Sequence, residues 1–338
     1  MTIARNQSTG KVGEQDVKPN QAETSGIMPQ RGDVERRCRA SIVSMALMML
    51  VLGLAGCRSL APSSMMANSL GGVVKGMRQH PDPELVREGS ATLLLLIDGL
   101  LAKTPDNPDL LLTGAAGYTT YCQAFLTNEE DQPRAALLYE RAKANGLRIL
   151  SQRRAFAAAL GAGQDTFEDA LQHFTRSDVP AIYWTAAAWL GSILSQPDSM
   201  RALAELPKAL ALMKRVLELN ETYEHGSAHL AMGIYYAVQP PGAGRDLDRS
   251  GKHFNRARDL AGPARLSPAV LLAEFYATAA GDTQLFLRTL TAVTETNINE
   301  LPNDDALANS VAQRRAQWLL DNRGDYFLEL DDDTGDDQ

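Results

Sequence analysis

Apolar residues recur at helical spacing along nearly the whole chain after Pro83, and this pattern constrains the fold more than any other feature. Ala and Leu, both strong helix formers, dominate these runs. Runs rich in Val, Ile and Thr, which would indicate strands, are nearly absent. Two examples of the helical spacing are Leu93, Leu96, Ile97, Leu100 and Leu101, and Leu210, Met213, Val216 and Leu217. We therefore predict an all-α fold of about ten to twelve helices joined by short connections.

Within these helices, small and aromatic residues recur in a loose repeat that is similar to tetratricopeptide (TPR) hairpins. Small residues let two helices approach closely, and an aromatic side chain fills the gap toward the next hairpin. The spacing between repeats is irregular, which predicts degenerate TPR-like hairpins stacked in a compact bundle. The first-helix positions are Leu111, Gly114, Ala115 and Tyr118; Trp184, Ala187, Ala188 and Gly191; His229, Met232, Gly233 and Tyr236; and Ala269, Leu272, Ala273 and Tyr276. The clearest second-helix positions are Ala135, Tyr139 and Ala142, and Ser250, Phe254 and Ala257.

The N-terminal region has the order of a secretory signal peptide. Arg36, Arg37 and Arg39 precede an apolar run of 14 residues, Ile42 to Ala55. A spanning helix needs about 20 apolar residues, so this run is short for a transmembrane helix. Leu-Ala-Gly followed by Cys57 resembles a bacterial lipobox, in which the cysteine is acylated and the peptide before it is removed. We predict a signal peptide over residues 1–56 and a lipid-anchored chain beginning at Cys57.

Some alternatives remain open at this end of the chain. Residues 1–35 are long and polar for a signal peptide, so Met28 is an alternative start. The apolar run is also compatible with a short buried helix and an incidental cysteine. Arg58 follows Cys57, whereas Asp at that place is typical of retention in the inner membrane. Arg58 therefore favours the outer membrane.

Charge and cysteine content restrict the classes of function. The residues after position 56 comprise 26 basic and 36 acidic side chains, a net charge of −10. An acidic chain without a basic cluster argues against nucleic-acid binding. Cys38 leaves with the signal peptide and Cys57 is the predicted lipid site. Cys122 alone remains, so no internal disulfide is expected, and its apolar neighbours indicate a buried thiol.

The polar motifs point to neither catalysis nor a metal. Glu221, His225 and His229 have the i, i+4, i+8 spacing of a helical zinc face, but Gly226 interrupts the run. The segment 242–246 (GAGRD) lacks the strand and the Gly-Lys-Ser/Thr of a phosphate loop, so we expect a turn with Asp246 capping the next helix. No nucleophile elbow, zincin or Cys-x-x-Cys motif occurs. We predict a non-enzymatic protein without cofactor or metal.

An aromatic cluster is the best candidate for a ligand site. Its members are Tyr183, Trp184, Trp189, Tyr236 and Gln239, with Tyr235 beside them. Aromatic residues at helical spacing are usually core, and packing between hairpins is the plainer interpretation. The functional interpretation is an apolar cleft with a few polar groups for a small ligand. The sequence alone leaves both open.

Several stretches resemble the T-component family of TRAP transport systems, which are periplasmic lipoproteins with a TPR-like fold. The resemblance covers nearly all of the chain after Cys57 and is carried by 180–189 (PAIYWTAAAW), 229–246 (HLAMGIYYAVQPPGAGRD), 252–257 (KHFNRA), and Asn309, Arg315, Ala316, Leu319 and Leu320. It implies a homotrimer with apolar clefts that associates with a periplasmic substrate-binding protein in the uptake of a small organic or hydrophobic ligand. It implies no catalytic residue.

The expected organisation is a signal peptide (1–56), a lipidated tether (57–80), a TPR-like domain (81–328) and an acidic tail (329–338). The leading hypothesis is a ligand- and partner-binding lipoprotein of a TRAP-type uptake system. The alternative is a TPR-like scaffold lipoprotein for envelope or outer-membrane assembly. A neighbouring gene for a substrate-binding protein or a permease would favour the first, and an envelope-assembly operon the second.

Overall fold

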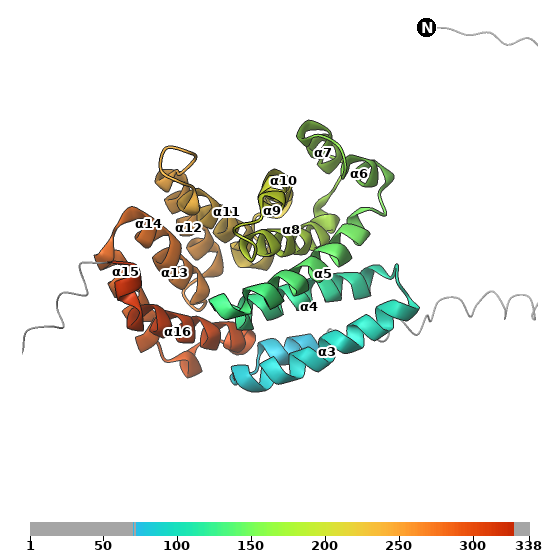
Figure 1. Ribbon diagram of the computed structural model, residues 1–338. Coiled ribbons are helices and arrows are strands. Elements are labelled where there is room, and N and C mark those ends of the chain that lie inside the picture. Colours follow the sequence, from blue (N-terminus) through green and yellow to red (C-terminus); the bar gives the residue numbers. More distant parts are fainter. Residues whose placement is uncertain (1–69, 71, 328–338) are drawn as a thin grey trace, which may run out of the picture. The chain divides into compact units, whose positions relative to one another are not determined.

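The computed structural model describes residue 70 and residues 72–327, all of which lie in one compact unit. The predicted signal peptide, Cys57, most of the tether and the acidic tail fall outside these residues. The described part contains the 14 helices α3 to α16, labelled in Figure 1, a further helical stretch near its start, and no strand. The all-α prediction is confirmed, whereas TPR-like repetition stays a prediction. No helix in this described part combines the length and apolar character needed to cross a bilayer.

The helices are labelled α3 to α16 in Figure 1. The longer ones are α3 (Pro83–Lys103), α4 (Pro108–Phe125), α5 (Gln132–Leu150), α7 (Gln164–Leu171), α8 (Val179–Leu194), α10 (Leu206–Asn220), α11 (Ser227–Val238), α12 (Leu247–Ala261), α15 (Thr283–Glu295) and α16 (Ala306–Asp321). The short ones are α6 (Arg154–Ala159), α9 (Met200–Ala204), α13 (Ser267–Leu271) and α14 (Thr278–Ala280). A π-helical turn, Leu272–Ala277, joins α13 to α14. Residues 72–78 are also helical, so the fold begins inside the predicted tether.

Helix starts follow the capping signals of the sequence. The side chains of Asp82 and Asn107 accept hydrogen bonds from the first backbone N–H groups of α3 and α4, and proline begins each helix. Asp246 caps α12 by accepting from the backbone N–H of Arg249 at 2.9 Å, which confirms the turn predicted over 242–246. These caps separate consecutive helices and let them fold back on each other.

Consecutive helices pack in pairs, with α4 on α5, α8 on α10, α11 on α12 and α15 on α16. Glycines lie where two helices come closest, as the repeat pattern predicts. A Cβ added at Gly191 of α8 would lie 2.3 Å from the ring of Tyr139 in α5. One added at Gly233 of α11 would lie 2.9 Å from the ring of Phe254 in α12. Small residues and aromatic rings therefore set the spacing both within a pair and between pairs.

The core is divided between two main clusters. The larger is centred on α8 and α10 and includes the fully buried Ile182, Leu212 and Met213. The second joins the stretch α13–α14 to α15 and α16 around Phe286 and Leu319. Because the aromatic candidates lie on α8 and α11, the larger cluster positions the candidate site.

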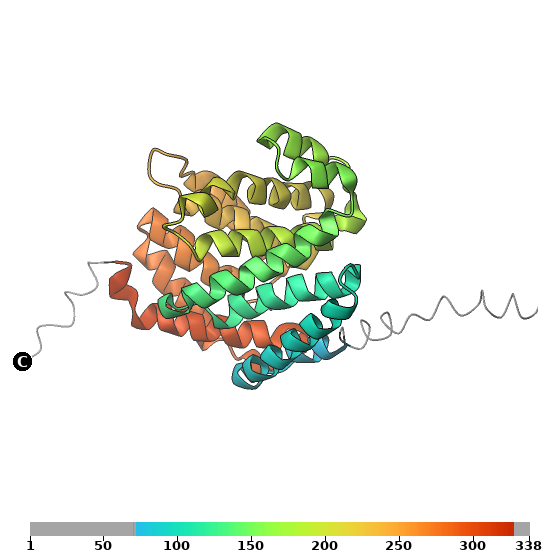
Figure 2. The same ribbon diagram turned by 45° about the vertical axis from the view of Figure 1, so that its right-hand side comes forward.

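The beginning and end of the described chain lie side by side. In Figures 1 and 2, α16 runs next to the N-terminal part of α3. The Ser310 hydroxyl donates to the Pro81 carbonyl at 3.1 Å, and Arg314 forms an ion pair with Glu84 at 2.6 Å. Residues more than two hundred positions apart thereby close the helical array.

Residues of the family-like motif near the C-terminus have structural partners. The Asn309 side chain is buried, accepts from the Leu266 N–H at 3.1 Å and donates to the Ala264 carbonyl at 2.9 Å. Arg315 pairs with Glu274 in the π-helical turn. Asn309 therefore satisfies backbone groups of the loop before α13, and Arg315 ties α16 to the π turn.

Candidate functional site

Three aromatic residues meet at the start of α8. The ring centroids of Tyr183 and Trp184 are 5.0 Å apart at an interplanar angle of 77°, and Tyr183 is 5.3 Å from Tyr223. Tyr183 is buried, whereas Trp184 and Tyr223 are half-buried. Burial, helped by the nearby carboxylate of Glu224, raises the pKa of Tyr223 to about 12. The group is thus an uncharged, edge-to-face aromatic cluster in which Trp184 and Tyr223 are partly exposed.

A strained turn places Tyr223 in this group. Tyr223 begins the short helix Tyr223–Gly226, in which Glu224, His225 and Gly226 have φ values of 44°, 56° and 83°. Non-glycine residues rarely adopt this left-handed conformation, which costs of order 1–3 kcal/mol each. The Glu224 carbonyl accepts from the Ser227 hydroxyl at 2.6 Å, which helps to hold the turn. This turn also breaks the helical spacing of Glu221, His225 and His229, so His225 is exposed and apart from the other two.

Trp189 lies elsewhere on α8 and is buried. Its indole N–H donates to Glu205 at 2.6 Å, and the Lys143 ammonium lies 5.4 Å from its ring centroid. Lys143 is also 3.2 Å from the Glu205 carboxylate. The edge-to-face contact with Phe167 completes a fully partnered environment. Trp189 therefore packs in the core and holds a polar cluster together.

The third part of the candidate set lies on α11. Tyr236 is half-buried and stacks on His253 at 5.7 Å, with the Arg249 guanidinium 5.6 Å from its ring centroid. Tyr235 is 5.1 Å from Tyr236. Gln239 follows α11 and is half-buried, and its backbone carbonyl accepts from Arg245 at 2.9 Å. Tyr236 thus lies next to a cationic and imidazole-bearing part of α12, and Gln239 lies next to Arg245 in the loop before that helix.

The structure brings some of the five candidates together and separates others. Tyr183 and Trp184 are in contact, Trp189 is turned toward Phe167 and Glu205, and Tyr236 packs against the same large cluster from α11. Sequence reasoning missed Tyr223 and His253. Tyr223 lies outside the repeat pattern. His253 is in one of the stretches that resemble the T-component family. Its ring contacts His229, which is 24 residues earlier in the sequence.

A hydrogen-bonded chain crosses from α10 to α12. Glu221 pairs with Arg256 and accepts from His229 at 3.1 Å, and the Nδ1 atoms of His229 and His253 are 2.9 Å apart. The Arg256 guanidinium, with His229, lowers the pKa of Glu221 to about 2. The two imidazoles share one Nδ1 contact instead of converging on a common point. Among the described residues, no group of three or more His, Cys, Asp or Glu is arranged to hold a metal ion.

The contact between His229 and His253 makes the stability of the fold depend on pH. Burial, with the charges of His229 and Arg249, lowers the pKa of His253 to about 4. The unfolded chain then takes up a proton near the usual value of about 6.5, while the folded chain stays neutral at His253. We expect the melting temperature to fall as the pH decreases from 6.5 toward 4, and less so in His253→Phe, which keeps the ring stacked on Tyr236. Thermal unfolding across this range checks the slope, and equal slopes in the two proteins would contradict it.

Cys122 behaves as its sequence context indicates. It is 1% exposed in α4, and burial raises its pKa to about 12, so the thiolate is strongly disfavoured. Among the described residues it is a free cysteine. A nucleophilic role is therefore disfavoured, and Cys122 contributes to packing against α5.

The chain belongs to the TRAP transporter T-component family. The family's sequence model matches residues 79–327, nearly all of the described helical unit. A protein of Treponema pallidum (strain Nichols) described as uncharacterized is 20% identical over 266 residues, which cover 74% of this chain and 82% of that protein. The sequence resemblance is thus confirmed, and the protein is a component of a TRAP transport system.

Proposed function

We propose that this protein is a non-catalytic, periplasmic lipoprotein that binds a substrate-binding protein and a small organic or hydrophobic ligand. The family match over residues 79–327 is the single observation that carries the proposal. An all-helical unit with a partly open aromatic cluster is consistent with a binding role. The mechanism is passive: the substrate-binding protein delivers or receives ligand at this unit, and separate permease subunits carry it across the inner membrane.

The proposed location rests on Cys57. Acylation of its thiol, with removal of residues 1–56, would hold the helical unit on the periplasmic face of a membrane, and Arg58 favours the outer membrane. Two or more acyl chains give stable anchoring, whereas one gives only marginal binding. Intact mass of the purified protein tests this proposal, because we expect a chain that begins at an acylated Cys57. A mature chain that begins elsewhere would contradict it.

The partner is tested in solution with the unacylated chain from Arg58 onward. We propose a homotrimer, as the family resemblance implies, that associates with a periplasmic substrate-binding protein of a TRAP system. Native mass spectrometry is expected to show three copies alone and a larger assembly when that binding protein is added. A strictly monomeric chain would overturn the trimer. Absence of binding to the substrate-binding protein would overturn the proposed partner.

Within the unit, we propose that the ligand contacts the aromatic group at the start of α8. Of its members, Trp184 is half-buried and is the most informative to change. Trp318 of α16 is a matched control, because it is 41% exposed and its ring faces Arg315 at 4.3 Å.

Trp184→Ala is expected to weaken binding of an apolar fluorescent probe, 1-anilinonaphthalene-8-sulfonate, by about tenfold or more, equivalent to about 1.4 kcal/mol. Trp318→Ala is expected to leave it unchanged. Probe titration and thermal unfolding of both variants check this. A stability loss of about 3–5 kcal/mol in Trp184→Ala would instead identify a core packing residue.

A further inference from the structure

Helix α3 carries leucines on its outer side as well as on its inner side. Val86, Leu94 and Ile97 are buried toward the fold. Leu85, Leu95 and Leu96 are 54%, 69% and 50% exposed. A surface helix of a globular protein normally exposes charged or polar residues on this side. Exposed apolar residues gathered on one element indicate an interaction surface.

The outer side of α3 is also nearly free of charge. Between Glu88 and Lys103, its exposed positions are Thr92, Leu95, Leu96, Gly99 and Ala102. We call these residues the α3 patch. Leu85 is not part of it, because the exposed Glu88 lies between Leu85 and Thr92.

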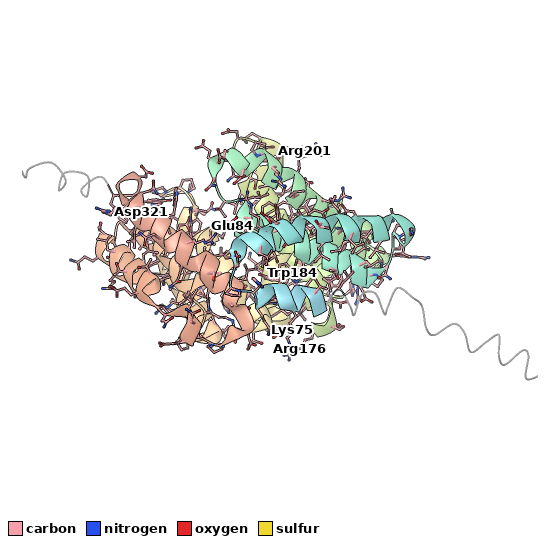
Figure 3. All side chains as sticks on the ribbon, turned by 90° about the horizontal axis from the view of Figure 1, so that it is seen from below. Lys75, Glu84, Arg176, Trp184, Arg201 and Asp321 are labelled. Atoms are coloured by element: carbon pink, nitrogen blue, oxygen red, sulfur yellow. The ribbon has the colours of Figure 1, made fainter. Side chains whose placement is uncertain are left out.

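Asp98 falls in the same span but is turned away from the patch. Its carboxylate accepts from the Tyr118 hydroxyl at 2.5 Å and pairs with Arg141 at 2.8 Å. The view from below in Figure 3 shows α3 in front of the other helices. The patch is thus an uncharged strip about three turns long, on a helix at the edge of the fold.

The start of the described chain connects this strip to the predicted lipid site. Leu70 is buried against Ile97 and Leu110, so the chain enters the fold beside the middle of α3. Leu70 is 13 residues after Cys57. Even a fully extended segment of that length spans only about 45 Å. An acyl chain on Cys57 therefore keeps the middle of α3 within about 45 Å of a lipid surface.

We propose that the α3 patch lies on the lipid surface that holds Cys57, with its leucines in the headgroup region. This proposal rests on the lipid anchor of the proposed function. The anchor turns docking into an intramolecular event, so a weak apolar contact is enough. The uncharged patch also keeps the net negative charge of the exported chain away from the contact. The helical unit then lies flat on the membrane, with α3 parallel to its plane.

A second copy of the chain is a less suitable occupant. Stable protein interfaces bury about 800 Å² on each partner, with a packed apolar centre. The apolar part of the α3 patch is mainly the two leucine side chains Leu95 and Leu96 on one helix, which is much smaller. A lipid surface needs no complementary shape, and an isolated apolar strip is sufficient for it.

The experiment compares two single-cysteine labels in the full acylated protein. Leu95→Cys places a fluorophore in the patch. Met200→Cys is the control, because Met200 is 78% exposed and apolar but lies on α9. In Figure 1, α8, α5 and α4 lie between α9 and α3. Acylation blocks the thiol of Cys57, and Cys122 is buried, so the label reacts only at the introduced cysteine.

Each labelled protein is reconstituted in phosphatidylethanolamine–phosphatidylglycerol vesicles that carry a shallow nitroxide-labelled lipid. We expect several-fold stronger quenching at position 95 than at position 200, with a blue-shifted emission at 95 alone. Equal quenching at the two positions would overturn the proposal. Disulfide formation between two copies at position 95, in place of quenching, would assign the patch to a second copy and also overturn it.

The intact mass of the protein distinguishes failure of the membrane docking from failure of the lipid anchor. An acylated chain whose label at position 95 is unquenched would overturn docking and leave the anchor intact. A chain without acylation at Cys57 would overturn the anchor, and docking with it.

Discussion

Replacing Gly146 by alanine is expected to destabilise the fold by about 2–3 kcal/mol, although alanine is the better helix former. Gly146 lies in α5 where this helix crosses α8. A Cβ at this position would lie 2.2 Å from Thr185 Oγ1, 2.9 Å from Thr185 Cβ and 3.0 Å from Thr185 Cα. Thr185 is buried, and its hydroxyl donates to the Ala181 carbonyl at 2.6 Å. Because a backbone atom is among the contacts, only a shift of the two helices relieves the overlap.

Gly99→Ala is the matched control. Gly99 is also inside a helix, α3, but a Cβ there meets nothing within 4 Å. Alanine is expected to stabilise the chain by about 0.5–1 kcal/mol at this exposed position, because glycine loses more backbone entropy on folding. Urea unfolding followed by circular dichroism measures both. The close approach of α5 and α8 would be refuted if Gly146→Ala were as stable as Gly99→Ala.

Thr185→Ala provides a second check on the same contact. It removes the hydroxyl nearest to the new methyl group and leaves Cβ and Cα of residue 185, at 2.9 and 3.0 Å, in place. In the double variant, we therefore expect part of the loss from Gly146→Ala to be recovered, with a coupling energy of about 0.5–3 kcal/mol. If the stability changes of the two single variants simply add in the double variant, the strain in Gly146→Ala does not arise from contact with Thr185.

Local features were predictable because each depends on neighbours in sequence. The helical period, the caps at Asp82 and Asn107 and the turn before Asp246 all involve contacts within a few residues. The small-residue pattern also anticipated that Gly191 and Gly233 mark close helix contacts. Helices that are joined by short connections are expected to pack against each other, so the pairing of neighbouring helices was also predictable.

Long-range features were not predictable from one chain. Nothing in the order Tyr-Glu-His-Gly shows that Glu224 and His225 adopt left-handed conformations, because tertiary contacts impose this strain. The turn is what adds Tyr223 to the aromatic group, so that group was incomplete in the sequence prediction. Trp189 fits the aromatic spacing equally well, yet its partners Glu205 and Lys143 make it a core residue. Spacing along a helix does not show which face is covered.

Asp305→Ala is expected to cost about 3–5 kcal/mol, because it leaves two arginines without their shared carboxylate in a partly buried place. Asp305 precedes α16, and its side chain is only 10% exposed. One oxygen accepts from Arg78 at 2.8 Å. The other oxygen forms an ion pair with Arg265 at 2.6 Å. Arg78 also lies 3.6 Å from Glu224 of the strained turn.

This cluster joins four segments that are far apart in sequence: the residues before α3, the strained turn, the loop before α13 and the start of α16. Its loss is therefore expected to free residues 72–80 as well as to lower stability. Hydrogen exchange of the variant should show faster exchange there and in 223–226, with α5 and α8 unchanged. Uniform loss of protection across all helices would argue against a local clamp.

Asp106→Ala is the control for the ion pair itself. Asp106 pairs with Arg148 at 2.9 Å, but both side chains are largely exposed, so the cost is expected to be below about 1 kcal/mol.

The pH dependence of stability provides an independent test of Asp305. Burial alone would raise the pKa of Asp305, but the bond to Arg78 and the charges of both arginines lower it below its usual value. A depressed carboxyl pKa stabilises the fold above the unfolded pKa of about 3.9, and this contribution is lost as the pH falls through the lower, folded value. The difference between wild type and Asp305→Ala should therefore be full near neutral pH and shrink below about 4. A difference that persists unchanged in acid would mean that Asp305 acts through packing instead of through its charge.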